Sequence, residues 1–314
     1  MSHSSEAHGL GPHVVGQRVV VRRLVRGETG PSGGPAMTDL LGVCTAWGDG
    51  ACVVVPESGE PVRIALADIV SGKPVPPRPS VRQRVSPRDA ELHTHALWPR
   101  VRVEPLGEWL LRTDPAPVGR LLKRANSCLA MGDPGADLDA ATRAVREFYA
   151  GLRRPAIVQV ERGSAVDDAL VAAGWSPAPD GDAHFLIGSL ARALRLARRA
   201  AGVAAEVVED DDGLLVELTE SGLGGGTAGG VGVVATGRAA LTRDWLGLHG
   251  VAVDPAYRRR GLATAVVAAL LERGAEQGAT TAWLHVETDN APALALYDAL
   301  GFAVHHTCRY LLAP

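Results

Sequence analysis

The sequence predicts an α/β protein that begins with a small all-β barrel. Two observations support this fold class. Short strands separated by turns fill residues 14–80, a pattern typical of small barrels. From residue 100 onward, strands alternate with segments of helical periodicity, a pattern typical of α/β folds. A chain of 314 residues is long enough to hold more than one hydrophobic core.

The N-terminal part carries its clearest signal at Gly48-Asp49-Gly50, which separates two apolar runs and predicts a hairpin. We expect a small SH3-like β-barrel over 14–80, preceded by a disordered tail at 1–13. Prolines and charged residues follow the barrel, so residues 81–99 are expected to form a proline-rich linker.

Two stretches of the remaining chain resemble each other. The strand Ile157–Glu161 leads to a helix that ends at Gly174-Trp175, and Leu284–Glu287 leads to one that ends at Gly301-Phe302. This recurrence suggests a duplication, with one unit at 100–190 and another at 191–314. Because α/β chains produce such patterns by chance as well, duplication and coincidence both remain open at this point.

Composition excludes several classes of function. The formal charge of −3 gives no general attraction to nucleic acid or to an anionic membrane. The start of the chain lacks the apolar segment of a signal peptide, and no apolar run is long enough to span a bilayer. We therefore expect a cytoplasmic protein with no membrane association, for which nucleic acid is an improbable partner.

The spacing of cysteines and histidines predicts no metal site. The four cysteines are widely scattered and form no C-x-x-C pair. His93 and His95 could contact a metal, but no third ligand is evident near them. A reducing compartment fits this use of cysteine.

The most informative segment is a strand that turns directly into a helix. Leu248–Val253 reads as a strand ended by Pro255, and a basic turn then leads into a helix with an apolar stripe. The first amides of a helix have no intrahelical partners, so they and the helix dipole form a site for phosphate groups. Gly261 lets an anion approach the backbone. The alternative is a solvated basic turn before an ordinary helix.

A second strand and helix follow. Thr281–Glu287 reads as a strand, Pro292 stands in the first turn of the next helix, and Gly301 closes that helix. Taken alone, Asn290 could be a helix cap. Tyr297 could likewise be an aromatic residue packed under the sheet.

Together these motifs resemble the GNAT superfamily of N-acetyltransferases. The resemblance covers Gly230–Tyr310 and is strongest at Val251-Ala-Val-Asp-Pro255 and Arg258-Arg-Arg-Gly-Leu-Ala263. It continues through Asn290 and Tyr297 to Gly301-Phe302. It implies an α+β GNAT fold, in which helices flank a mixed central sheet, and acetyl-CoA as co-substrate.

The resemblance also implies roles for individual residues. Tyr297 would protonate the departing CoA thiolate, and Asn290 would contact the pantetheine portion. A phenol can act as such a general acid. The backbone of the strand would pair with the pantetheine arm, and the turn with the start of the helix would bind the pyrophosphate. The strand residues are Val251, Ala252 and Val253, and those of the turn and helix are Arg258, Arg259, Arg260, Gly261, Leu262, Ala263 and Thr264.

The family does not fix a general base at one position. His249, at the end of the core strand, and Glu287, at the end of the next, are the candidates nearest to the expected cleft. Deprotonation of the amine through water is the alternative, as in many members of the family.

The whole chain resembles actinobacterial two-domain acetyltransferases, which join an SH3-like barrel to a GNAT region. If residues 100–190 are a degenerate repeat, their counterpart of Tyr297 is Leu170, which cannot donate a proton. We therefore expect acetyl transfer to a primary amine by direct attack, without an acyl-enzyme. The barrel is a candidate site for a protein partner. The alternative function is a non-catalytic acyl-CoA-binding regulator. The identity of the amine cannot be deduced from these motifs.

Overall fold

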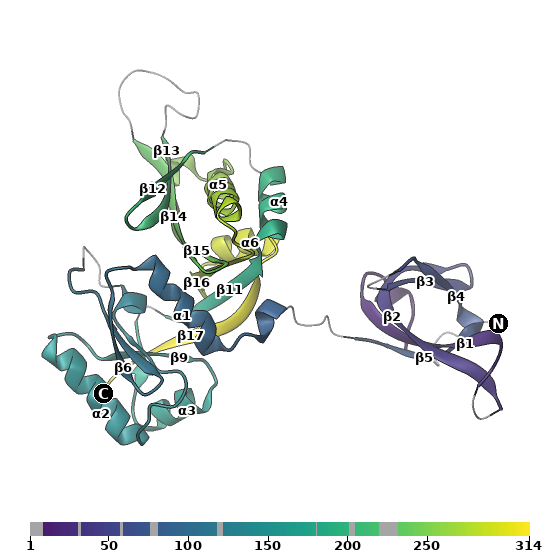
Figure 1. Ribbon diagram of the computed structural model, residues 1–314, viewed down its shortest axis with the longest axis horizontal. Coiled ribbons are helices and arrows are strands. Elements are labelled where there is room, and N and C mark those ends of the chain that lie inside the picture. Colours follow the sequence, from purple (N-terminus) through teal and green to yellow (C-terminus); the bar gives the residue numbers. More distant parts are fainter. Residues whose placement is uncertain are drawn as a thin grey trace. The chain divides into compact units, whose positions relative to one another are not determined.

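The computed structural model describes residues 9–30, 33–56, 59–75, 81–117, 122–179, 181–200, 205–219 and 232–314. The chain divides into two compact units, unit 1 at Met1–Pro79 and unit 2 at Ser80–Pro314. Figure 1 shows the elements of both units. None of the helices in the described ranges combines the length and apolar character needed to cross a bilayer.

Unit 1 is built on a five-stranded antiparallel sheet with the order β4-β3-β2-β1-β5. The expected hairpin is confirmed, because Gly48 pairs with Ala51 and the intervening Asp49 and Gly50 both have positive φ. The elements are η1 (Pro12–Val14), β1 (Arg18–Thr29), β2 (Pro35–Gly48), β3 (Ala51–Pro56), β4 (Val62–Ala65), η2 (Leu66–Asp68) and β5 (Ile69–Pro74).

Two expectations for this unit need correction. In the described part of unit 1, β4 and β5 are the edges of the sheet and do not pair with each other, so the sheet is not a closed barrel. Residues 1–8 of the expected tail lie outside the described residues, but residues 9–13 are ordered. Leu10 is buried in the apolar core, which explains why this segment is held against the sheet.

Unit 2 is organised around one long mixed sheet. Its strands follow the order β12-β13-β14-β15-β16-β11-β17-β9-β8-β7-β6, and β10 pairs with β17 off this path. The strands are β6 (Arg102–Leu106), β7 (Trp109–Thr113), β8 (Cys128–Leu129), β9 (Ile157–Glu161), β10 (Ser176–Pro177), β11 (Ala183–Ser189), β12 (Val207–Asp210), β13 (Gly213–Thr219), β14 (Val233–Thr242), β15 (Trp245–Val253), β16 (Thr281–Glu287) and β17 (Ala303–Leu312).

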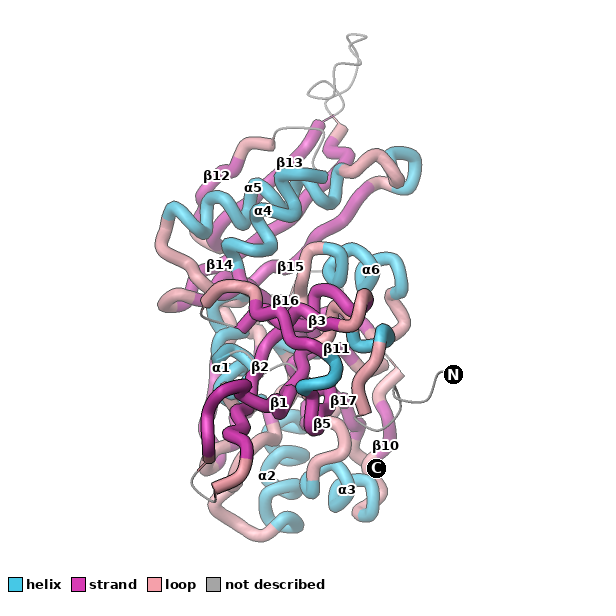
Figure 2. Tube along the Cα trace, turned by 90° about the vertical axis from the view of Figure 1, so that its right-hand side faces the viewer, coloured by secondary structure: helices cyan, strands magenta, loops and turns pink. Residues whose placement is uncertain are grey.

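Helices cover both ends of this sheet. In Figure 2, α4 and α5 lie side by side. Helix α5 packs on β12, β13, β14 and β15, and α4 contacts β11 and β16. The helices are η3 (Val81–Arg84), α1 (Pro87–Leu92), η4 (His93–Leu97), η5 (Lys123–Ala125), α2 (Leu138–Gly151), α3 (Ala165–Ala172), α4 (Leu190–Ala200), η7 (Pro255–Tyr257), α5 (Leu262–Glu276) and α6 (Ala291–Ala299).

The two halves of unit 2 repeat one topology and exchange their last strands. In the first half, the antiparallel pairs β6–β7 and β7–β8 precede the parallel pair β8–β9, whose strands are connected by α2. In the second half, the antiparallel pairs β13–β14 and β14–β15 precede the parallel pair β15–β16, whose strands are connected by α5. The strand that ends the first half, β11, pairs with β16, whereas the last strand of the chain, β17, pairs with β9. The boundary expected at residue 190 therefore does not separate two compact units.

The expectation of a linker at 81–99 is wrong. This segment forms η3, α1 and η4, and its Ala90 and Leu97 are buried against Phe185 and Trp283 of the sheet. Ser86 caps α1 by accepting a hydrogen bond from the Asp89 amide at 3.0 Å, and Pro87 occupies the first helical position. Burial of these apolar side chains holds the segment on the sheet.

Candidate active site

The central feature of the site is the divergence of two neighbouring strands. Strands β15 and β16 pair in parallel from Trp245–Thr281 to Leu248–Leu284, and no pairing between them continues beyond that point. Strand β15 nevertheless runs on to Val253, and β16 to Glu287. The edge of β15 that faces β16 is therefore open over residues 249–253, where backbone amides and carbonyls can pair with a bound molecule.

A bulge shapes this open edge. On its other side β15 stays paired with β14, but the register shifts between Thr236–Ala252 and Arg238–His249. Gly250 lies at this shift with φ +62°, a value that a residue with a side chain rarely adopts. The bulge bends β15 next to Val251, Ala252 and Val253, which are the residues expected to face the pantetheine arm.

The turn after β15 leads into a helix end that no side chain caps. The Asp254 carboxylate accepts a hydrogen bond from the Ala256 amide at 2.8 Å and so stabilises η7. Gly261 stands at the N-cap of α5 with φ +76°, and it has no side chain to satisfy the first amides. The first three helical residues, Leu262, Ala263 and Thr264, present N–H groups that lack intrahelical partners. Those groups can bind an anion such as pyrophosphate.

The three arginines of the turn are exposed to solvent. Arg258 Nε lies 3.5 Å from the Val253 carbonyl oxygen, and the Arg260 guanidinium lies 5.0 Å from the centre of the Tyr257 ring. Arg259 takes a positive φ of 64°. The sequence motif thus places its positive charges beside the open end of α5, as the expected pyrophosphate site requires.

Asn290 and Tyr297 both lie on or next to α6. The Asn290 side-chain oxygen accepts a hydrogen bond from the Ala293 amide at 3.2 Å, so this residue caps the helix. Tyr297 is 5% exposed and packs edge-on against Phe302 with 5.6 Å between ring centres. Burial raises the pKa of Tyr297 to about 12, which keeps its phenol protonated throughout the physiological range.

Glu287, one candidate base, already makes two ion pairs. Its two carboxylate oxygens accept hydrogen bonds from Lys123 and Arg124, each at 3.0 Å. The Lys123 side chain is only 4% exposed and also donates to the Gly181 carbonyl. Lys123 and Arg124 escaped the sequence reasoning because they lie far from Glu287 in the chain and belong to no motif.

His249, the other candidate base, has a different environment. It pairs in register with Arg238 on β14, and its ring meets Trp98 edge-on with 6.1 Å between centres. Its Nε2 is buried and has no hydrogen-bond partner among the described residues. Burial and, secondarily, the Arg238 charge lower the pKa of His249 to about 4, so the imidazole is neutral at physiological pH.

The segment 81–99 lies on the face of the sheet that carries His249. Besides the contact of Trp98 with His249, the His93 ring stacks on Trp245 of β15 with 4.2 Å between centres. The segment was expected to be a proline-rich linker. The structure instead makes η4 one wall beside the open part of β15.

Comparisons with known proteins agree with this geometry. The family model described as "Acetyltransferase (GNAT) family" matches residues 192–302. The chain is 46% identical over 55 residues to the [ribosomal protein bS18]-alanine N-acetyltransferase of Escherichia coli K12, which is 18% of this chain and 37% of that protein. It is 49% identical over 53 residues to the mycothiol acetyltransferase of Segniliparus rotundus, which is 17% of this chain and 20% of that protein.

Among solved structures, a GCN5-related N-acetyltransferase from Kribbella flavida resembles the chain with a TM-score of 0.55 and 19% identity. That likeness covers 72% of this chain and 95% of that one, and it supports the fold alone. The chain spans little more than a third of the length of the first curated relatives, and their activities are therefore not transferred to it directly. The residues that match the GNAT family model include both the open edge of β15 and the uncapped N-terminus of α5.

Proposed function

We propose that the protein transfers an acetyl group from acetyl-CoA to a primary amine. The observation that carries this proposal is the open edge of β15 beside the uncapped N-terminus of α5. The backbone of residues 251–253 pairs with the amides of the pantetheine arm, and Arg258–Thr264 bind the pyrophosphate. The free amide of Asn290, whose oxygen is used for the cap, donates to the pantetheine.

The reaction is a direct attack on the thioester. The neutral amine nitrogen bonds to the acetyl carbon, and the carbon–sulfur bond then breaks. The nitrogen loses one proton to a base, and the departing thiolate gains one from the Tyr297 phenol. An acid in such a position typically contributes about 10²–10⁴ in rate.

The contacts favour His249 over Glu287 as the base. Both oxygens of Glu287 are engaged by cationic side chains, whereas Nε2 of His249 has no partner among the described residues. With a pKa of about 4, His249 is unprotonated at physiological pH and accepts the acidic proton of the tetrahedral intermediate, not that of a free ammonium group. Glu287 then acts as an anchor for the end of β16.

The first half of unit 2 is proposed to be a degenerate repeat of the catalytic half. Its repeated topology supports this, and Leu170 stands on α3 where Tyr297 stands on α6. Its segment around Lys123 and Arg124 contacts the end of β16, which suits a wall of the acceptor cleft. Unit 1 is proposed to bind a protein partner, in the manner of an SH3-like domain in a two-domain acetyltransferase of actinobacterial type.

Substitution of Tyr297 by Phe tests the proposal. We expect acetyl-CoA affinity to stay within about twofold, while turnover of the preferred amine falls at least tenfold. Tyr149→Phe is the matched control, because this phenol is also buried but lies on α2 in the first half. Equal turnover in Tyr297→Phe and wild type would refute the assigned acid. Absence of turnover in the wild type with a broad amine panel would favour the acyl-CoA-binding regulator.

A further inference from the structure

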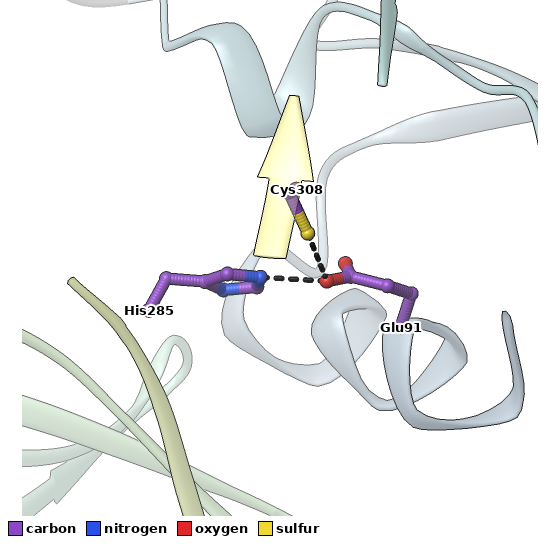
Figure 3. A group of neighbouring side chains, drawn as sticks. All are labelled: Glu91, His285 and Cys308. Carbon is purple, nitrogen blue, oxygen red and sulfur yellow. Dashed lines mark hydrogen bonds and ion pairs between the residues drawn. The ribbon is translucent and has the colours of Figure 1, made fainter. Parts of the chain in front are cut away.

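Four side chains from three elements meet beneath α1. Glu91 lies on α1, His285 on β16, and His306 and Cys308 on β17. Glu91 Oε1 is 2.7 Å from His285 Nε2, 3.0 Å from Cys308 Sγ and 3.2 Å from His306 Nε2. Figure 3 shows His285 and Cys308 directed at this same oxygen from different strands. We call these four residues the Glu91 cluster.

The Glu91 cluster is sealed from water and lacks a cation of its own. Glu91 and Cys308 are fully buried, and the side chains of His285 and His306 are 3% and 2% exposed. Among the described residues, no lysine or arginine forms an ion pair with Glu91, and Arg124 acts on it only at longer range. Buried carboxylates are normally paired with a cation or bound to a metal.

The hydrogen bonds of Glu91 are unevenly distributed. Three polar side-chain atoms lie within 3.2 Å of Oε1, whereas Oε2 is buried without any partner among the described residues. A carboxylate held only by hydrogen bonds would divide such contacts between its two oxygens, because an unsatisfied buried oxygen costs free energy. The free Oε2 leaves one ligand position unused within the cluster.

The neighbours of His306 determine its tautomer. His305 Nε2 lies 2.9 Å from the Val85 carbonyl oxygen, which can only accept, so this nitrogen carries the hydrogen. In a neutral His305, Nδ1 is then an acceptor, and His306 Nδ1 at 2.8 Å must donate to it. His306 Nε2 therefore holds a lone pair directed at the carboxylate oxygen. Two lone pairs face each other there unless a cation lies between them or an imidazole is charged.

We propose that Glu91, His285, His306 and Cys308 bind a divalent transition-metal ion, with zinc as the best match. Imidazole nitrogen, thiolate sulfur and carboxylate oxygen are the ligands that zinc takes in proteins, and four of them make a closed structural site. Binding releases the thiol proton of Cys308 to solvent. The ion relieves the lone-pair contact of His306 and supplies the positive charge that Glu91 lacks.

The surroundings supply the outer contacts that metal ligands usually have. Gln159 Nε2 donates to Cys308 Sγ at 3.1 Å, and His305 holds His306 in orientation. The ligand atoms of Glu91, His285 and Cys308 lie within 4.8 Å of one another. Tetrahedral zinc separates its ligand atoms by about 3.3–3.6 Å, so the contacts to Oε1 must widen by a few tenths of an ångström. Rotation of the Glu91 carboxylate, whose other oxygen is free, provides this space. His306 Nε2 lies outside the group of ligand atoms within 4.8 Å of one another, so it must also move closer to His285 or Cys308.

The site would fasten the segment 81–99 to the sheet. Glu91 is the ligand from that segment, and the other three come from β16 and β17. The ion thus adds a bond between α1 and the strands on either side of β11. It stabilises the folded unit in proportion to its binding.

The test uses the purified 314-residue chain, freed of metal with a chelator and titrated with zinc or cobalt alone. We expect about one zinc per chain by elemental analysis, as in a closed four-ligand site. We also expect a higher melting temperature after addition of zinc, and a thiolate-to-cobalt charge-transfer band with cobalt. If the wild type neither binds zinc nor gains stability, the cluster is a metal-free imidazolium–carboxylate network and the proposal is wrong.

Variants locate the site. Cys308→Ser is expected to lose the cobalt band and at least tenfold of the zinc affinity, and Cys128→Ser is expected to keep both. Cys128 is the matched control, because its thiol is also buried in unit 2 but lies outside the cluster. Equal loss in both variants, or a cobalt band that survives in Cys308→Ser, contradicts the assignment. Should Cys308→Ser fail to fold, the wild-type titrations decide alone.

Discussion

Lys123 Nζ lies 3.0 Å from Glu287 Oε2, although 164 residues separate the two in the chain. This ion pair joins η5 in the first half of unit 2 to the end of β16 in the second. Beyond Leu284, β16 no longer pairs with β15, but its other edge stays paired with β11 as far as Glu287. The first half thereby holds the strand that borders the proposed cofactor cleft.

Glu287→Gln is expected to destabilise the protein by about 3 kcal/mol, because it removes the carboxylate charge that pairs with the buried Lys123 ammonium group. Denaturant titration measures the change. Glu272→Gln is the control, since its ion pair with Arg198 is solvent-exposed and should contribute less than about 1 kcal/mol. If Glu287→Gln retains its stability but loses turnover, Glu287 is the general base and the anchoring role is wrong.

His249 makes the stability depend on pH in a defined window. Its folded pKa of about 4 lies below the unfolded value of 6.5, so the unfolded chain binds more protons between these limits. The contribution of neutral His249 to the free energy of unfolding is fully present above about pH 6.5 and is lost as the pH falls towards 4. At pH 5 the loss is about 2 kcal/mol. Unfolding free energies of wild type and His249→Gln at pH 7 and pH 5 measure it, and an equal fall in both would exclude His249 as the source.

Gly261→Ala is expected to weaken acetyl-CoA binding at least tenfold. Gly261 has φ +76°, a conformation that costs residues with a side chain about 1–2 kcal/mol, so the variant shifts the first amides of α5. Gly278→Ala is the control, because φ is +90° there with open space around the added carbon, and the residue lies beyond the other end of α5. Similar weakening in both variants would show a general effect of stability and not a role in binding.

Local patterns predicted individual helices, strands and turns more fully than they predicted how distant strands pair. The strand, basic turn and helix from Leu248 to Glu276 are consecutive, so their order and residue types were enough to indicate an anion site. The turn at Asp49-Gly50 was equally readable, because its conformation depends on those two residues. Closure of the N-terminal sheet into a barrel depends on pairing between distant strands, and no local signal encodes it.

For the segment 81–99, amino-acid composition led to a wrong prediction of its structure. Its prolines indicated a linker, but Ser86-Pro87 followed by Asp89 is a helix start that the sequence did contain. The helix has only six residues, so periodicity gave no sign of it. Its burial arises from Ala90 and Leu97 meeting the sheet.

Neither the Glu91 cluster nor the strand exchange could be predicted from the sequence, because both depend on pairing between distant strands. Glu91, His285 and Cys308 come from widely separated segments, so no spacing rule for metal ligands applies to them. They meet only because β17 crosses to pair with β9 and β11. Such long-range pairing is a property of the whole sheet.

Calorimetric titration with acetyl-CoA tests the central claim most directly. The wild type is compared with a variant that combines Arg258→Ala, Arg260→Ala and Gly261→Ala, in low and high salt. Binding of the wild type in the micromolar range, weakened by salt and at least tenfold weaker in the variant, is the predicted result. Absence of binding to the folded wild type, or equal affinity in the variant, would contradict the assignment of β15 and α5 as the cofactor site.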